Sequence, residues 1–137
     1  MNFLSGILHH AESISAILNP TVNSYRRTQA SMTTSGSTWA PRNISWTNNN
    51  RTHMVRIPEN GRFELRLADG SVNPYLLQAA ILASGLLGIE NKYKMPEISL
   101  RDNSLRNDFN DEKLLPTNLG DSLKKIREDN IFRKMIG

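Results

Sequence analysis

The spacing of apolar residues predicts a helix at each end of the chain. Between residues 3 and 18 apolar side chains recur every three or four positions, which is the period of one helix face. Asn19 and Pro20 end this helix, because the residue before a proline avoids helical backbone angles. A similar stripe follows Pro116 and predicts a last amphipathic helix, with apolar positions at Leu119, Leu123, Ile126, Ile131 and Met135.

A further helix is predicted over residues 75–89, and it differs from the other two. Asn73 is a favourable N-cap residue, and Pro74 suits the first helical position. The helix is apolar on nearly every side, which is typical of the centre of a core. It is too short and too often interrupted to indicate a membrane span. Such a helix implies more surrounding protein than this chain supplies.

Short runs of β-branched and large apolar residues in the middle of the chain predict about three antiparallel strands. Residues 43–47 form the first of them. Residues 50–58 and 62–67 form a β-hairpin, because an Asn-Gly turn signal at residues 60–61 lies between them. Together with the helices, these strands predict an α+β fold.

The hairpin carries an unusual density of arginine. In its second arm, alternation places Arg62, Glu64 and Arg66 on one face. The first arm adds Arg51 and Arg56. A row of this kind either lies in water or faces an anionic, metal-bearing ligand. The density is unusual for a plain solvated edge, but the pattern alone leaves both interpretations open.

The segments between these elements are predicted to be irregular. Residues 19–42 are polar and are expected to form a long loop. Residues 93–114 are charged, with few large apolar side chains, and are expected to be an irregular linker. We therefore divide the chain into a core over residues 1–92, this linker, and a C-terminal helix within residues 115–137.

Composition and charge narrow the classes of function. The chain has 137 residues, which is a suitable length for one domain. It has 17 basic and 13 acidic residues. Because it has no cysteine, it can form neither disulfides nor thiolate sites. The start of the chain has neither a signal-peptide pattern nor a membrane span, and we expect a cytoplasmic protein. Arginine interleaved with tryptophan and tyrosine raises nucleic-acid binding as an alternative, but the net charge of +4 is small for that role.

Several segments, read in order, resemble the C-terminal part of the catalytic domain of glutamine synthetase. They are residues 19–27 (NPTVNSYRR), 50–58 (NRTHMVRIP), 62–66 (RFELR) and 73–76 (NPYL). Two other stretches, residues 34–39 and 65–70, are most similar to the type III or γ-glutamylmethylamide synthetase branch. Four motifs in the right order make the resemblance specific, and it implies that the strands line an active-site barrel.

The resemblance also implies a reaction and a role for each charged residue. The family ligates glutamate to ammonia or a small amine through γ-glutamyl phosphate, using ATP and Mg²⁺ or Mn²⁺, in glutamine biosynthesis and nitrogen metabolism. Guanidinium groups suit carboxylates and phosphates, and hard cations prefer carboxylate oxygen. The matching motifs assign Arg27 and Arg66 to glutamate binding, Arg51 to the transferring phosphoryl group, Arg51, Arg56 and Arg62 to ATP, and Glu64 to a metal ion.

Two departures from the family pattern affect the expected activity. Trp39 stands where many members have a glutamate that helps to deprotonate ammonium. The N-terminal domain and the earlier metal ligands of the family have no counterpart, so we expect the chain to be an incomplete segment that is inactive alone. The missing half, or homologous subunits of the family's ring-shaped oligomer, are its expected partners. The alternative is a non-catalytic remnant or an interaction subunit of such an oligomer.

Overall fold

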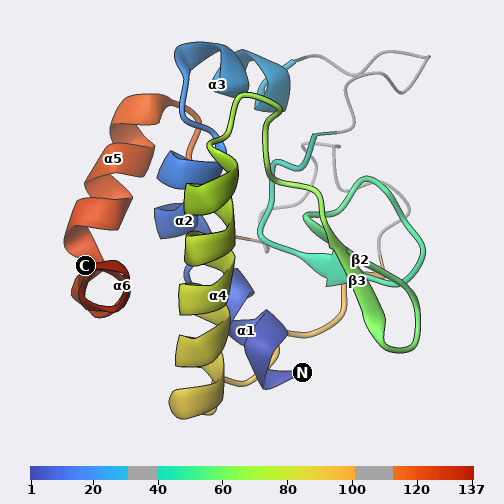
Figure 1. Ribbon diagram of the computed structural model, residues 1–137. Coiled ribbons are helices and arrows are strands. Elements are labelled where there is room, and N and C mark those ends of the chain that lie inside the picture. Colours follow the sequence, from blue (N-terminus) through green and yellow to red (C-terminus); the bar gives the residue numbers. More distant parts are fainter. Residues whose placement is uncertain (31–39, 101–112) are drawn as a thin grey trace.

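A computed structural model describes residues 1–30, 40–100 and 113–137, with the helices packed beside a small sheet (Figure 1). Within these ranges the helices are α1 (Asn2–His9), α2 (Ala11–Leu18), α3 (Val22–Thr28), α4 (Pro74–Glu90), α5 (Leu119–Glu128) and α6 (Asn130–Ile136). The strands are β1 (Trp46–Thr47), β2 (Val55–Glu59) and β3 (Arg62–Leu65). This mixture confirms the α+β class. No helix in the described ranges has the length and apolar composition needed to cross a bilayer.

The helix predicted over residues 3–18 is present but interrupted. It is divided into α1 and α2 at His10, whose φ and ψ are −93° and 13°. The apolar stripe that predicted it does face the core, where Ile7 and Ile14 are fully buried. The interruption has no signal in the hydrophobic pattern, because the stripe continues across it.

The polar stretch after Pro20 is predicted to be a loop throughout, but α3 forms within it. A reciprocal pair of hydrogen bonds explains how this polar helix starts. The Ser24 amide donates to the Thr21 hydroxyl, and the Thr21 amide donates to the Ser24 hydroxyl, both at 3.2 Å. This capping box satisfies amides that the first helical turn leaves without partners. Tyr25 then anchors α3, because its hydroxyl donates to Ser122 of α5 at 2.7 Å.

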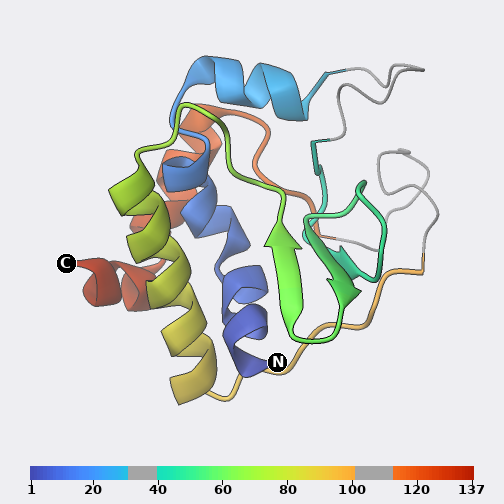
Figure 2. The ribbon, with the colours of Figure 1, turned by 45° about the vertical axis from the view of Figure 1, so that its right-hand side comes forward.

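The three strands form one sheet in the order β1-β2-β3. β2 and β3 form the predicted antiparallel hairpin, and Gly61 takes a φ of +83° in its turn, a value that favours glycine. β1, in contrast, pairs parallel to β2, with Trp46 opposite Val55, so the prediction of antiparallel strands is wrong for this pair. The hairpin lies beside α1 (Figure 2), where the Phe3 and Phe63 rings are 6.5 Å apart.

α4 crosses α1 at very close range. An added Cβ at Gly88 would lie 2.2 Å from the Asn2 carbonyl oxygen and 2.6 Å from the Gly6 nitrogen. An added Cβ at Gly6 would lie 2.0 Å from the Ser84 carbonyl oxygen. The two helix backbones are therefore in contact, and no side chain larger than hydrogen fits between them at these positions.

The opposite face of α4 is not covered, although the sequence predicts a helix buried on every side. Its N-terminus is as predicted, since the Asn73 side chain accepts hydrogen bonds from the Tyr75 and Leu76 amides. Buried residues such as Ala80 and Leu87 face the rest of the chain. The described elements pack against one side only, so large apolar residues remain exposed on the other.

The last predicted helix is also divided, into α5 and α6, at Asp129. Asn118 caps the start of α5, and its side chain accepts a hydrogen bond from the Asp121 amide at 2.8 Å. Before α5, residues 113–115 lie antiparallel to residues 42–44. The Ile44 amide donates to the Lys113 carbonyl at 2.8 Å, and the Leu115 amide donates to the Arg42 carbonyl at 2.8 Å.

A partly buried hydrogen-bond cluster joins the two divided helices where each is interrupted. His10 Nδ1 lies 2.6 Å from Asp129 Oδ2, and the Ser13 hydroxyl donates to the same oxygen at 2.7 Å. Burial opposes ionisation of Asp129, but these hydrogen bonds outweigh it, so the pKa of Asp129 lies below its ordinary value of 3.8. The His10 ring and the Ser13 hydroxyl both bond to the Asp129 carboxylate and not to each other. This arrangement favours a structural role for the cluster.

Replacing this carboxylate should destabilise the chain in a pH-dependent way. A hydrogen bond to a charged group contributes about 1.5–3 kcal/mol, so we expect Asp129→Asn to lower the free energy of unfolding at pH 7 by about 2 kcal/mol. A depressed pKa stabilises the folded state above the unfolded pKa, and this contribution disappears as the pH falls through the folded pKa. Urea unfolding of both proteins at pH 7 and at decreasing pH measures it. A difference that does not shrink below pH 3.8 would contradict this account.

Candidate functional site

The charged face of the hairpin is an ion cluster centred on Glu64. Arg56 lies opposite Glu64 across β2 and β3, and its Nη1 donates to Glu64 Oε1 at 2.7 Å. Arg66 Nη1 lies 3.7 Å from the other carboxylate oxygen. The hydrogen bond from Arg56 is the main reason that the pKa of Glu64 lies below its ordinary value. An ionised carboxylate is thus held between two guanidinium groups.

Arg51 reaches this cluster from the loop between β1 and β2. The Asn50 side chain accepts hydrogen bonds from the amide and hydroxyl of Thr52, at 3.0 and 2.9 Å, and so shapes the turn that contains Arg51. Arg66 Nε donates to the Arg51 carbonyl at 2.8 Å. The Arg51 side chain is exposed, and its guanidinium has no ion pair or hydrogen bond with any residue that the structure describes. It is therefore open to a ligand.

The charges in the cluster act on one another. Burial lowers the pKa of Arg66, and the positive charges of Arg51 and Arg56 act in the same direction, while Glu64 opposes them. Arg51, Arg56 and Glu64 therefore all act on the charge of Arg66. Alternation predicts that Glu64 and Arg66 share a face, but it does not place Arg51 or Arg56. We call these four residues the hairpin cluster. Three cations against one anion leave it positively charged.

Arg62 belongs to the same strand but has a different partner. It lies at the exposed end of the hairpin, where its Nε is 3.0 Å from Glu59 Oε1. More than half of each side chain is exposed, so this pair is readily exchanged for a ligand. The structure thus places Arg62 beside the turn, at the edge of the hairpin cluster.

Arg27 approaches the site from α3. Its Nη2 donates to the Leu67 carbonyl at 2.7 Å and to the Asn19 side chain at 3.1 Å, and its Nε lies 4.0 Å from Asp69. Burial lowers the pKa of Arg27, and Asp69 opposes this shift. The Nε is buried and has no hydrogen-bond partner among the described residues. Arg27 is therefore positioned next to Leu67, the residue that follows Arg66.

This arrangement suits phosphate and carboxylate groups better than a metal ion. Planar guanidinium groups donate paired hydrogen bonds to both kinds of anion. In the described ranges no group of three or more His, Asp or Glu side chains is close enough to hold a metal ion. Glu64 is a single carboxylate, already engaged by two arginines, so the residues present do not form a metal site by themselves.

The structure adds two side chains that sequence reasoning missed. Asn49 Oδ1 accepts hydrogen bonds from both Nε and Nη2 of Arg56, the first at 2.8 Å, and so fixes that guanidinium. Arg42 binds carbonyls at the end of α3, including that of Ala30 at 2.7 Å. Neither has a signal in the sequence, because each depends on a turn that returns it to its partner. Trp39, predicted to stand in place of the family's glutamate, lies outside the described residues.

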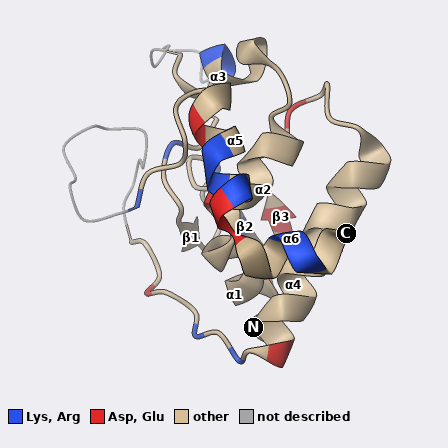
Figure 3. Cartoon of the chain, turned by 90° about the vertical axis from the view of Figure 1, so that its left-hand side faces the viewer, with Lys and Arg blue, Asp and Glu red and all other residues tan. Residues whose placement is uncertain are grey.

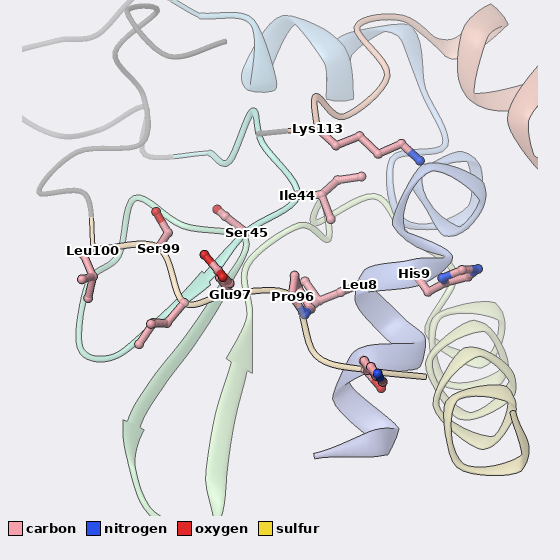
Figure 4. A pocket seen from close by; sticks show the side chains of 12 residues that line it. Leu8, His9, Ile44, Ser45, Pro96, Glu97, Ser99, Leu100 and Lys113 are labelled. Atoms are coloured by element: carbon pink, nitrogen blue, oxygen red, sulfur yellow. The ribbon is translucent and has the colours of Figure 1, made fainter. Parts of the chain in front are cut away.

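A cavity in the described part of the chain lies elsewhere. It has a volume of ≈ 870 Å³ and is lined by residues from α1, by residues 44–45 and 94–100, and by Lys113. In Figure 4 Leu8 and His9 lie on one side and Ser99 and Leu100 on the other. None of the predicted site residues lines it. The hairpin cluster therefore lies outside this cavity.

The family model that describes the catalytic domain of glutamine synthetase matches residues 1–137. The chain belongs to the glutamine synthetase family. This confirms the resemblance that the ordered motifs indicate. The arginines of the hairpin cluster lie within the sequence motifs that carry the resemblance to this family.

Individual relatives agree with the family model. The chain is 48% identical to a glutamine synthetase of Rhizobium meliloti over 99% of its own length, and 38% identical to a glutamate–methylamine ligase of Methyloversatilis universalis. Its fold matches a solved structure described as a GmaS/ADP complex, with a TM-score of 0.90 and 46% identity. The chain spans about a third of each of these relatives, between 31% and 32%.

Proposed function

We propose that the chain provides the arginine-rich part of an active site that ligates glutamate to ammonia or a small amine through γ-glutamyl phosphate. One observation supports this proposal most directly. Arg56 and Arg66 lie against Glu64 on one face of the hairpin, Arg66 also donates to the Arg51 carbonyl, and the Arg51 guanidinium is open to a ligand. The chain belongs to a family whose members include a glutamine synthetase and a glutamate–methylamine ligase.

The geometry supports a different role for each group of arginines. Arg51 and Arg56 would neutralise the phosphoryl group as it leaves ATP, because phosphoryl transfer depends mainly on positioning and charge neutralisation. Arg62 would bind an ATP phosphate at the open end of the hairpin by exchanging its exposed partner Glu59. Arg27 and Arg66 would hold the glutamate substrate, since they approach neighbouring positions at the end of β3.

The ions that assist this chemistry require ligands from elsewhere. Mg²⁺ and Mn²⁺ prefer oxygen ligands, and Glu64 alone cannot supply a coordination shell. We propose that Glu64 becomes one ligand after carboxylates of another polypeptide complete the site. The chain by itself should therefore lack ligase activity.

Combining the chain with a complementary polypeptide tests the proposal. We would co-express it with the part of the Rhizobium meliloti glutamine synthetase that it does not span, and measure the release of phosphate from ATP that depends on glutamate and on ammonia or methylamine. Activity of the mixture, with none from either polypeptide alone, is the expected result. A complex without activity would instead favour a non-catalytic interaction subunit.

A further inference from the structure

The uncovered face of α4 is an apolar stripe along the whole helix. Its residues follow one another at intervals of four and three positions, which keeps them on one side. They are Tyr75, Ala79, Leu82, Leu86 and Ile89, which we call the α4 stripe. Tyr75, Leu82 and Ile89 are 81%, 56% and 50% exposed. At 1.5 Å per residue the stripe is about 21 Å long.

α5 of the same chain has a solvated face and serves as a comparison. In α5 the exposed positions carry both positive and negative charge, including Lys124 and Glu128. Figure 3 shows this charge on α5, whereas α4 carries charge only at its end, at Glu90. Within a single protein, a helix face of this length without charge is typical of a surface that another polypeptide covers.

The described elements cannot cover the α4 stripe themselves. α1, α2 and α6 all pack against the opposite side of α4, and the Gly6–Gly88 crossing holds the α1 and α4 backbones in contact. Turning α4 to bury the stripe would therefore break this close crossing. The stripe is presented to the outside on a rigid helix.

The length of the relatives indicates which polypeptide would cover the α4 stripe. The chain spans 32% of the GmaS chain that it matches with a TM-score of 0.90, so this third keeps its fold in a protein three times as long. We propose that the α4 stripe binds an apolar segment of the remaining two thirds of a glutamine synthetase family chain. This inference rests on the proposed function, because the same polypeptide supplies the missing part of the active site.

Labelling of a single thiol tests the proposal, because the chain contains no cysteine. We would introduce Leu82→Cys on the stripe and, as a matched control, Lys124→Cys on the exposed face of α5. The rate at which a maleimide modifies each thiol is then measured by mass spectrometry, with and without the complementary part of the Rhizobium meliloti relative. We expect at least tenfold slower labelling of Leu82→Cys in the mixture and an unchanged rate for Lys124→Cys.

Other outcomes separate this inference from the proposed function. Ligase activity of the mixture without slower labelling of Leu82→Cys overturns the inference and leaves the proposed function intact. Slower labelling without activity supports the inference while the proposed function fails. Protection that rises with the concentration of the chain alone would assign the stripe to a second copy and overturn the proposed occupant. Far-UV circular dichroism confirms the fold of each variant, and Leu86→Cys provides a second position.

Discussion

Replacing Arg51 with alanine should lower kcat of the completed enzyme on the order of 10²–10³-fold. This is the usual cost of removing one donor that stabilises developing charge in a transition state. Arg51 is the residue of the hairpin cluster whose guanidinium is unoccupied by any described residue, so a ligand would meet it first. Steady-state release of phosphate by the mixture with the complementary polypeptide measures the effect.

A second arginine provides the control for this experiment. Arg26 is exposed on α3, next to Arg27 but outside the hairpin cluster, and Arg26→Ala removes the same charge from the chain. We expect Arg26→Ala to retain the activity of the unmodified mixture. Arg51→Lys should recover only part of the loss, because lysine supplies the charge without the planar pair of donors. Equal losses for Arg26→Ala and Arg51→Ala would indicate an effect of net charge alone.

Replacing Gly88 with alanine should destabilise the fold more than any surface substitution. The new Cβ would lie 2.2 Å from the Asn2 carbonyl oxygen, and backbone cannot move aside as a flexible side chain does. Overpacking of a core typically costs about 1–3 kcal/mol, and contact with backbone puts Gly88→Ala at the upper end, about 3 kcal/mol. Chemical unfolding followed by circular dichroism measures this loss.

Gly70 gives the matched comparison. It lies in a turn with nothing within 4 Å of the position that a Cβ would occupy. We expect Gly70→Ala to leave the free energy of unfolding unchanged or to raise it by up to about 1 kcal/mol, because alanine restricts the unfolded chain. If Gly88→Ala proved as stable as Gly70→Ala, the close crossing of α1 and α4 would be wrong.

The parts of the fold that the sequence predicts well are those set by local chemistry. The hairpin turn follows from Asn60 and Gly61, and the start of α4 follows from Asn73 and Pro74, since neighbouring residues decide each of them. The charged row on β3 follows from alternation. Alternation also places Glu64 and Arg66 on one face, but it does not place Arg51 or Arg56, which join the hairpin cluster through contacts from other segments.

The parts that could not be predicted depend on distant contacts. The parallel pairing of β1 with β2 has no local signal, because its direction depends on how the loop between them returns. α3 lacks an apolar stripe and is anchored by the hydrogen bond from the Tyr25 hydroxyl to Ser122, 97 residues away. The position of Arg27 depends on the Leu67 carbonyl, forty residues away. In each case a tertiary contact overrides the local pattern.

The pairing of residues 42–44 with residues 113–115 also has a consequence for how the chain folds. Its bridge between Asn43 and Leu114 closes a long stretch of chain, and such distant contacts form slowly because the entropy of closing the loop is lost first. During synthesis on the ribosome the hairpin can form once residues 50–67 have been made, but residues 42–44 gain this partner only after residues 113–115 have been made. Until then these two backbone hydrogen bonds are not formed, and backbone groups of this kind can pair with another strand.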